Sequence, residues 1–280
     1  MVRAHSTGGG GSRPAVWAGR ILLLVAVVAA RAVAAAPPAA PAAPVAARAP
    51  VAAAHWTSIE QRIEREYFQQ NASALKALAV TLAPQAGADS PDAQWRSYYA
   101  ALLSYRLALL AQSDPARAWP FSQQCVDRLD QTLAIDAASA EALALQSACL
   151  ALQSRLDPWR APLAGPLSMS RFDKALTLAP HNPRVLLLGA LAACDRPRLF
   201  GGDRRVAFSL MRRAASAFEQ QGAQPRGLPA WGAAEAFTGL ARDYLTRGEP
   251  VAARDVLERA LLVAPDFTQA RLLMAEIVSG

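Results

Sequence analysis

Arginine side chains gather in one part of the chain, between positions 196 and 213. They could bind an acidic partner, because a guanidinium group can donate two parallel hydrogen bonds to one carboxylate. The same run is typical of a solvated helix face, which is the commoner role of such charges. The cluster consists of Arg196, Arg198, Arg204, Arg205, Arg212 and Arg213.

A pair of carboxylates flanks a glycine-rich turn in the same region. Asp195 and Asp203 stand on either side of Gly201-Gly202, and two acids in one cleft could serve as a general acid and a general base. We interpret the glycines as a sharp turn before a helix capped by Asp203, with anion binding as the alternative. The HExxH, CxxC, P-loop and GxSxG patterns are missing from the sequence. The sequence therefore predicts no enzyme, no cofactor and no metal site.

Three cysteines, Cys125, Cys149 and Cys194, fall on the small, apolar faces of predicted helices. An odd number without framework spacing does not predict a disulfide scaffold, and buried free thiols are the simplest interpretation. One bridge between Cys125 and Cys149, which belong to neighbouring helices, is the alternative in an oxidising compartment.

The net charge of +7 is not spread evenly along the chain. Residues 1–50 carry five arginines and no acid, whereas from residue 51 onward 24 basic side chains face 22 acidic ones. A surface that binds a nucleic-acid duplex needs a clustered surplus of positive charge. We therefore expect no nucleic-acid partner.

Predicted helix pairs position these residues, and the clearest pair spans Ala234–Pro265. Apolar residues from Phe237 to Tyr244 recur at helical spacing, Gly248 provides a left-handed stop, and Pro250 suits the first turn of the second helix. Weaker copies of this pair cover Trp95–Ala137, Ala140–Pro180 and Pro183–Gln220.

A capping hairpin at 56–88 precedes the repeats, and a final helix after Pro265 would cap the other end of the stack. Insertions relative to the repeat fall at 113–121, 156–166 and 195–203, and four prolines or glycines are expected to keep 156–166 irregular.

The pattern of aromatic, Leu, small and Tyr positions in the first helix, followed by Ala, Leu, Ala and Pro in the second, resembles a tetratricopeptide repeat. The resemblance implies an all-α, right-handed superhelix of helical hairpins. In this family the first helices of the pairs line a groove that binds extended peptides or partner proteins.

Residues 95–280 also contain short motifs that lie outside the repeat pattern. They are Asp157-Pro158-Trp159, Gly165-Pro166, Leu178–Arg184 (LAPHNPR), Pro197–Asp203 (PRLFGGD) and Trp231-Gly232. They resemble a narrower group of exported bacterial proteins of the tetratricopeptide type, in which the inserted loops recur in the same places. No activity is carried over from that group.

The N-terminal region is typical of an exported protein. A basic segment precedes ten apolar residues, Ile21–Ala30, and small residues follow, which predicts a signal peptide at 1–36. Residues 37–55 are rich in Ala and Pro, which predicts an extended linker. We expect a periplasmic protein without a membrane span in the mature chain, with anchoring to the inner membrane by an uncleaved segment as the alternative.

The expected function is that of an exported scaffold or adaptor that binds another protein or an extended peptide, without catalytic activity. The alternatives are a structural or accessory subunit of a cell-envelope complex and an enzyme on a helical scaffold. Loop aromatics could anchor a partner or, as we favour, pin the loops to the helices. The candidate partner-binding residues are Trp159, Arg184, Arg198, Phe200, Arg204, Arg205, Arg212 and Arg242.

Overall fold

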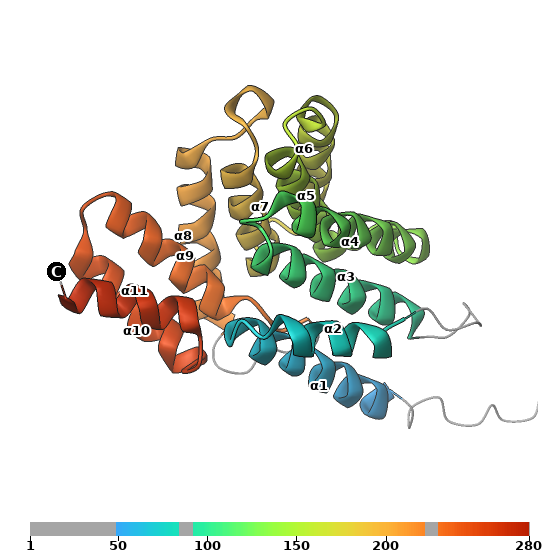
Figure 1. The fold of residues 1–280 in the computed structure, drawn as a ribbon, viewed down its shortest axis with the longest axis horizontal. Coiled ribbons are helices and arrows are strands. Elements are labelled where there is room, and N and C mark those ends of the chain that lie inside the picture. Colours follow the sequence, from blue (N-terminus) through green and yellow to red (C-terminus); the bar gives the residue numbers. More distant parts are fainter. Residues whose placement is uncertain (1–48, 84–91, 222–228, 280) are drawn as a thin grey trace, which may run out of the picture. The chain divides into compact units, whose positions relative to one another are not determined.

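The structure, a computed structural model, describes residues 49–83, 92–221 and 229–279. Within these ranges the regular secondary structure is helical throughout (Figure 1). The helices are α1 (Ala49–Phe68), α2 (Ala72–Thr81), α3 (Ala93–Leu110), α4 (Pro115–Ile135), α5 (Ala140–Leu156), α6 (Ala161–Leu178), α7 (Pro183–Asp195), the 3-10 helix η2 (Arg198–Phe200), α8 (Arg204–Gln221), α9 (Ala233–Thr246), α10 (Pro250–Val263) and α11 (Thr268–Ser279).

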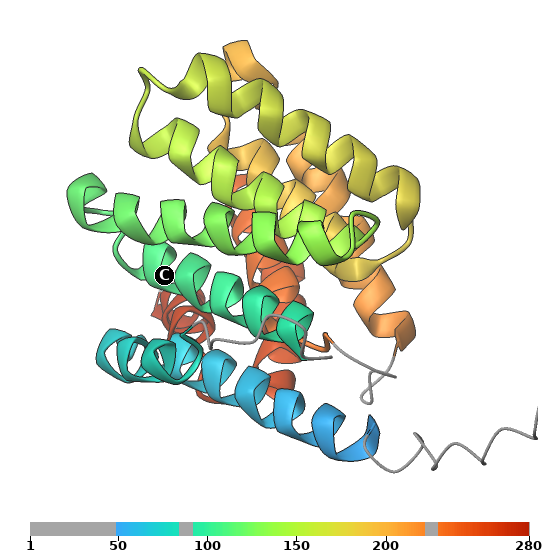
Figure 2. The same ribbon diagram turned by 90° about the vertical axis from the view of Figure 1, so that its right-hand side faces the viewer.

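Successive helices pack as hairpins, α3 with α4, α5 with α6, α7 with α8 and α9 with α10. Each hairpin then packs on the next through α4 with α5, α5 with α7 and α8 with α9 (Figures 1 and 2). This arrangement is a helical superhelix, and the predicted all-α fold class is confirmed.

Local sequence explains where the helices begin and end. The Asn182 side chain accepts hydrogen bonds from the backbone N–H groups of Arg184 and Val185, at 2.9 and 3.3 Å, and Pro183 occupies the first turn of α7. Gly248 adopts a φ of +75° after α9, a backbone conformation that costs glycine little. These features confirm the helix boundaries predicted there.

The first helices of three hairpins, α3, α5 and α7, are buried on most sides. In α5, fourteen of the seventeen residues are buried, and polar side chains among them find internal partners. Gln146, for example, donates to Asp130 at 2.7 Å, and Ser147 bonds with Ser168 across the hairpin. The polar positions of α5 therefore serve the interior of the protein.

The insertion at 156–166, which the sequence predicts as irregular, is helical from Ala161 onward, and the insertion at 113–121 is helical from Pro115 onward. Helix α4 begins at Pro115 and α6 at Ala161, and each has a proline in its first turn. A proline is tolerated there because the N–H group that it lacks would have no partner in the first turn. Pro120 and Pro166 lie farther inside these helices, where a proline costs roughly 3 kcal/mol. The burial of neighbouring small residues against the adjacent helices opposes that cost.

The N-terminal boundary also differs from the prediction. Helix α1 begins at Ala49, so residues 49–55 of the predicted linker are helical, in keeping with the high helix propensity of alanine. The predicted signal peptide and residues 37–48 of the linker lie outside the described residues. Among the described residues, no helix has the length and apolar character needed to cross a bilayer.

The cysteines depart from the simplest sequence interpretation. Cys125 of α4 and Cys149 of α5 are both fully buried and form a disulfide, with their Cα atoms 6.3 Å apart. Cys194 is free and exposed in the last turn of α7. The interpretation of three buried free thiols is therefore wrong, and the alternative bridge is present.

Candidate functional site

The first and last parts of the described chain meet in the structure. The Glu60 carboxylate on α1 accepts hydrogen bonds from the backbone N–H of Ala230 at 3.0 and 3.1 Å, and the rings of Phe68 and Phe267 lie 4.4 Å apart. Repeat proteins usually form contacts only between neighbouring repeats. Here α1 contacts the segment that leads into α9 and the turn before α11, so the stack closes on itself (Figure 1).

A buried cation lies at this closure. Arg106 of α3 is fully buried and forms ion pairs with Glu64 of α1, at 2.9 Å, and with Glu235 of α9. Its guanidinium group also lies over the rings of Tyr67 and Trp231, 4.3 and 4.9 Å from their centroids. We call these five residues the closure cluster, because they join α1, α3 and α9.

The charges of the closure cluster depend on one another. Burial alone would lower the pKa of Arg106, but Glu235 and Glu64 outweigh this effect and raise it, so the guanidinium stays protonated. Burial raises the pKa of Glu64 to about 8, and Arg106 opposes only part of that rise while Glu235 adds to it. Two carboxylates thus share one cation, and burial favours the protonated form of Glu64.

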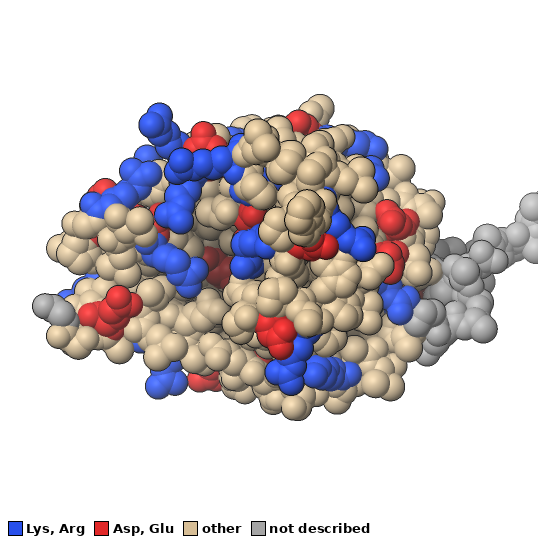
Figure 3. Space-filling model, turned by 45° about the horizontal axis from the view of Figure 1, so that its top comes forward, with Lys and Arg blue, Asp and Glu red and all other residues tan. Residues whose placement is uncertain are grey.

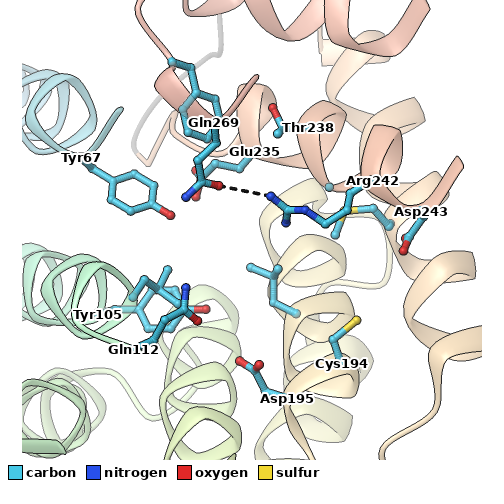
Figure 4. A pocket seen from close by; sticks show the side chains of 15 residues that line it. Tyr67, Tyr105, Gln112, Cys194, Asp195, Glu235, Thr238, Arg242, Asp243 and Gln269 are labelled. Atoms are coloured by element: carbon cyan, nitrogen blue, oxygen red, sulfur yellow. Dashed lines mark hydrogen bonds between the residues drawn. The ribbon is translucent and has the colours of Figure 1, made fainter. Parts of the chain in front are cut away.

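A cavity of about 270 Å³ lies beside the closure cluster, between α3, α7 and α9 (Figure 4). Its walls combine an apolar surface with a few polar groups, which is the usual composition of a ligand pocket. The inner cavity, as we call it, is lined by Tyr67, Tyr105, Leu109, Gln112, Leu191, Cys194, Asp195, Met211, Glu235, Thr238, Gly239, Arg242, Asp243, Phe267 and Gln269.

Two tyrosines contribute buried hydroxyl groups to the inner cavity. Tyr105 is fully buried, and its hydroxyl has no hydrogen-bond partner among the described residues. Figure 4 shows the hydroxyl of Tyr67 pointing into the same space. Burial raises the pKa of both phenols, so both remain protonated and can donate. A buried hydroxyl without a partner is costly, and a ligand atom could satisfy it.

The exposed side of the inner cavity carries charged residues. Arg242 donates a long hydrogen bond of 3.5 Å to Gln269, which leaves most of its donors free for a ligand (Figure 4). Asp195 pairs with Arg155 at 2.8 Å, yet burial raises its pKa. Burial, followed by the charges of Asp243 and Asp195, raises the pKa of Cys194, so this group stays a thiol.

The candidate partner-binding residues do not form one site. Arg242 lies at the inner cavity, whereas Arg184 is buried and donates to Glu141 at 2.9 Å. Trp159 is 93% exposed, so it does not pin its loop, while Phe200 is half-buried against α6. The remaining candidates are exposed on η2 and α8, and they are Arg198, Arg204, Arg205 and Arg212.

The arginines of the cluster between 196 and 213 likewise have different surroundings. Arg196 is buried and donates to Ser168 at 2.9 Å, which ties the α7–α8 connection to α6. Arg213 donates to the backbone carbonyl of Pro180 at 3.1 Å. The cluster therefore contains structural members as well as exposed ones, and its contact with a partner remains a prediction.

The two candidate acids also have different places. Asp195 lines the inner cavity at the end of α7, whereas Asp203 accepts a hydrogen bond of 2.7 Å from the Arg205 backbone N–H at the start of α8. Asp203 does not line the cavity. In the described part of the chain, no group of three or more His, Cys, Asp or Glu residues is arranged to hold a metal ion.

The sequence interpretation missed Arg106 and the two cavity tyrosines. Arg106 is the one charge in the apolar stretch from Tyr98 to Leu110, and a charge at such a position requires a buried partner. That signal identifies the cation but not its partners, because Glu235 is 129 positions away. Tyr67 and Tyr105 occur at ordinary helical spacing. This spacing does not show whether a tyrosine ring is packed in the core or lines a cavity.

A second, larger groove of about 690 Å³ runs between α1 and the turn from α10 to α11. Its lining includes Gln221 and Ala230, which stand next to residues outside the described ranges. We therefore base the candidate site on the inner cavity.

Comparisons with known proteins give a fold relative. No protein family matches the chain, and no curated protein matches it in sequence. Among solved structures, the HusA haemophore from Porphyromonas gingivalis is similar, with a TM-score of 0.53 and 21% sequence identity over 69% of this chain and 92% of that one. At this identity the comparison shows a shared helical fold, and the resemblance to tetratricopeptide repeats remains a prediction.

Proposed function

We propose that this chain is an exported, non-catalytic binding protein whose inner cavity receives part of a partner protein or an extended peptide. The observation that carries the proposal is the buried Tyr105 hydroxyl without a partner, which lines the cavity close to the exposed Arg242. An apolar side chain fits the wall formed by Leu109, Leu191 and Met211, and a peptide carboxylate suits Arg242.

The disulfide supports export independently of the N-terminal sequence. Disulfides persist in oxidising compartments and are rare in the cytosol of mesophiles. Cys125 and Cys149 are buried in the core, where their bridge joins the first two repeated hairpins. Together with the predicted signal peptide, it favours the periplasm or the cell exterior.

The test is a quantitative pull-down from an envelope extract with three variants of the full chain. Tyr105→Phe removes only the hydroxyl, and Arg242→Ala removes the exposed cation. Arg271→Ala, on the exposed face of α11, is the matched control. We expect one protein or peptide to be retained by the wild type and the control and lost from both cavity variants. Equal retention by all four chains would place the contact elsewhere and contradict the proposal.

A porphyrin is a second candidate ligand, because the fold is that of a haemophore and the inner cavity combines two phenols with the Cys194 thiol and the Met211 thioether. The cavity is smaller than the roughly 300–1,000 Å³ typical of drug-sized ligands, so a macrocycle would require α9 to move away from α3. Titration with haemin, followed by its absorbance, tests this candidate. A saturable spectral change that Tyr105→Phe and Tyr67→Phe weaken would support it, and an unchanged haemin spectrum would exclude it.

A further inference from the structure

The outer face of α6 and the turn before it carry large apolar side chains that none of the helices in the described ranges covers. Trp159 is 93% exposed, Leu163 is 78% exposed and Leu167 is 41% exposed. Leu163 and Leu167 are spaced four apart, which places them on one side of α6, away from the buried Ala164, Ser168 and Phe172 that face the core, and Trp159 lies in the turn just before the helix.

The 3-10 helix η2 extends this apolar area. A Cβ on Gly165 would stand 2.6 Å from the Cβ of Phe200, and a Cβ on Gly201 would meet the sulfur of Met169. These contacts show that η2 packs directly on α6. Leu199, 86% exposed, points away from that contact, and the exposed Pro162 and Pro166 lie between it and the α6 stripe. The α6 surface, as we call it, consists of Trp159, Pro162, Leu163, Pro166, Leu167 and Leu199.

The α6 surface is held rigidly from beneath. Arg196 donates to the Ser168 hydroxyl, and Ser168 donates in turn to the backbone carbonyl of Ser147 at 2.8 Å. All three residues are buried. The apolar side chains therefore stand on a fixed support, and their exposure does not follow from a loose loop.

Arginines outnumber acids near the α6 surface in the sequence. The exposed arginines there are Arg160, Arg198, Arg204 and Arg205, and the acids are the half-buried Asp157 and the exposed Asp203. Asp157 pairs with Arg160 at 3.3 Å, and Asp203 caps α8. Figure 3, in which the top of Figure 1 comes forward, shows uncharged surface with Lys and Arg as well as Asp and Glu side chains around it.

We propose that the α6 surface is a docking site for a bilayer that contains anionic lipids. Protruding tryptophan and leucine side chains with arginines beside them match an interface in which apolar groups enter the acyl boundary and cations contact headgroups. A protein partner would be anchored by pockets, and neither the inner cavity nor the groove beside α1 uses a residue of this surface.

Fluorescence of Trp159 in the full chain tests the proposal. The apolar run Ile21–Ala30 could bind lipid by itself and Trp17 lies near it, so each measurement is the difference between a chain with Trp159 and the same chain carrying W159F. We expect lipids brominated in the acyl chain to quench this difference in phosphatidylglycerol vesicles and much less in phosphatidylcholine vesicles. The partition coefficient into phosphatidylglycerol vesicles, obtained from the quenching, should fall by about a hundredfold or more in L163S/L199S, because two inserted side chains are lost.

The double variant V251S/L262S is the matched control, since Val251 and Leu262 of α10 are 76% and 83% exposed but lie outside the α6 surface. It should be quenched as strongly as the wild type. An unquenched Trp159 in phosphatidylglycerol would overturn the proposal, and equal quenching in both lipids would overturn its electrostatic part. Concentration-dependent sedimentation that L163S/L199S abolishes, without quenching, would assign the surface to a second copy of this chain instead.

Discussion

Two regions of this protein depart from the usual distribution of side chains. One region buries charged groups, and the other exposes large apolar side chains to water. The closure cluster places a full positive charge and two carboxylates in the interior, where charges are rarely found unless paired. The α6 surface places tryptophan and leucine in water while its polar support is buried. The closure cluster joins distant parts of the chain beside a cavity. The α6 surface leaves an apolar area exposed for binding, so the two regions serve different purposes.

The largest effect should come from breaking the closure cluster. Arg106→Leu leaves Glu64 and Glu235 buried without their cation, which typically costs about 3–5 kcal/mol of unfolding free energy. Denaturant unfolding measures this loss. Arg254→Ala, which removes an exposed pair with Glu258 on α10, should change stability by less than about 1 kcal/mol. Similar values for the two variants would show that the closure is not a structural lock.

The disulfide should contribute somewhat less to the unfolding free energy than the closure cluster does. Replacing Cys125 and Cys149 with alanine should lower the unfolding free energy by about 3 kcal/mol, because the bridge closes a loop of 24 residues. The bridge joins α4 to α5 and does not involve the closure cluster. The pH dependence of stability should therefore keep its shape in the double variant, and a changed profile would indicate that the two regions are coupled.

The closure cluster also predicts a pH dependence. The pKa of Glu64 is about 8 in the folded chain against an ordinary value of 4.5, so folding favours its protonated form. The stabilising contribution is complete below pH 4.5 and is lost as the pH rises through about 8. Its slope is at most about 1.4 kcal/mol per pH unit. Glu64→Gln should flatten this part of the stability profile, and an unchanged profile would contradict the assignment.

The smallest effect on stability should come from the α6 surface. L163S/L199S replaces side chains that already contact water, so the unfolding free energy should change by less than about 1 kcal/mol. Thermal unfolding of the variant provides the comparison. A large loss would mean that these residues are packed in solution, which would remove the contrast between the two regions.

The sequence predicts those parts of the fold that depend on neighbouring residues. The helical spacing in α9 and α10, the Asn182 cap and the Gly248 turn follow from local physical rules and are all present. The prolines of α6 gave a wrong expectation of an irregular loop at 156–166, because tertiary packing outweighs their local cost.

The candidate site could be predicted only in small part. Arg242 was selected as a carboxylate ligand and lies at the inner cavity, but its contact with a partner remains a prediction. The cavity itself depends on the meeting of α3 with α9, and Arg106 and Glu235 are 129 positions apart. Nothing in the periodicity of either helix specifies that pairing, and the exposure of Cys194 follows only from where α7 ends.

The accessibility of Cys194 tests the central claim most directly. With Cys125 and Cys149 bridged, Cys194 is the single free thiol, and it lines the inner cavity. Its labelling rate with a maleimide would be measured at alkaline pH, with and without the ligand identified by pull-down or haemin titration. We predict that the ligand slows labelling in the wild type and that Tyr105→Phe removes this protection. A ligand that binds the wild type without slowing the labelling of Cys194 would contradict the assignment of the inner cavity as the binding site.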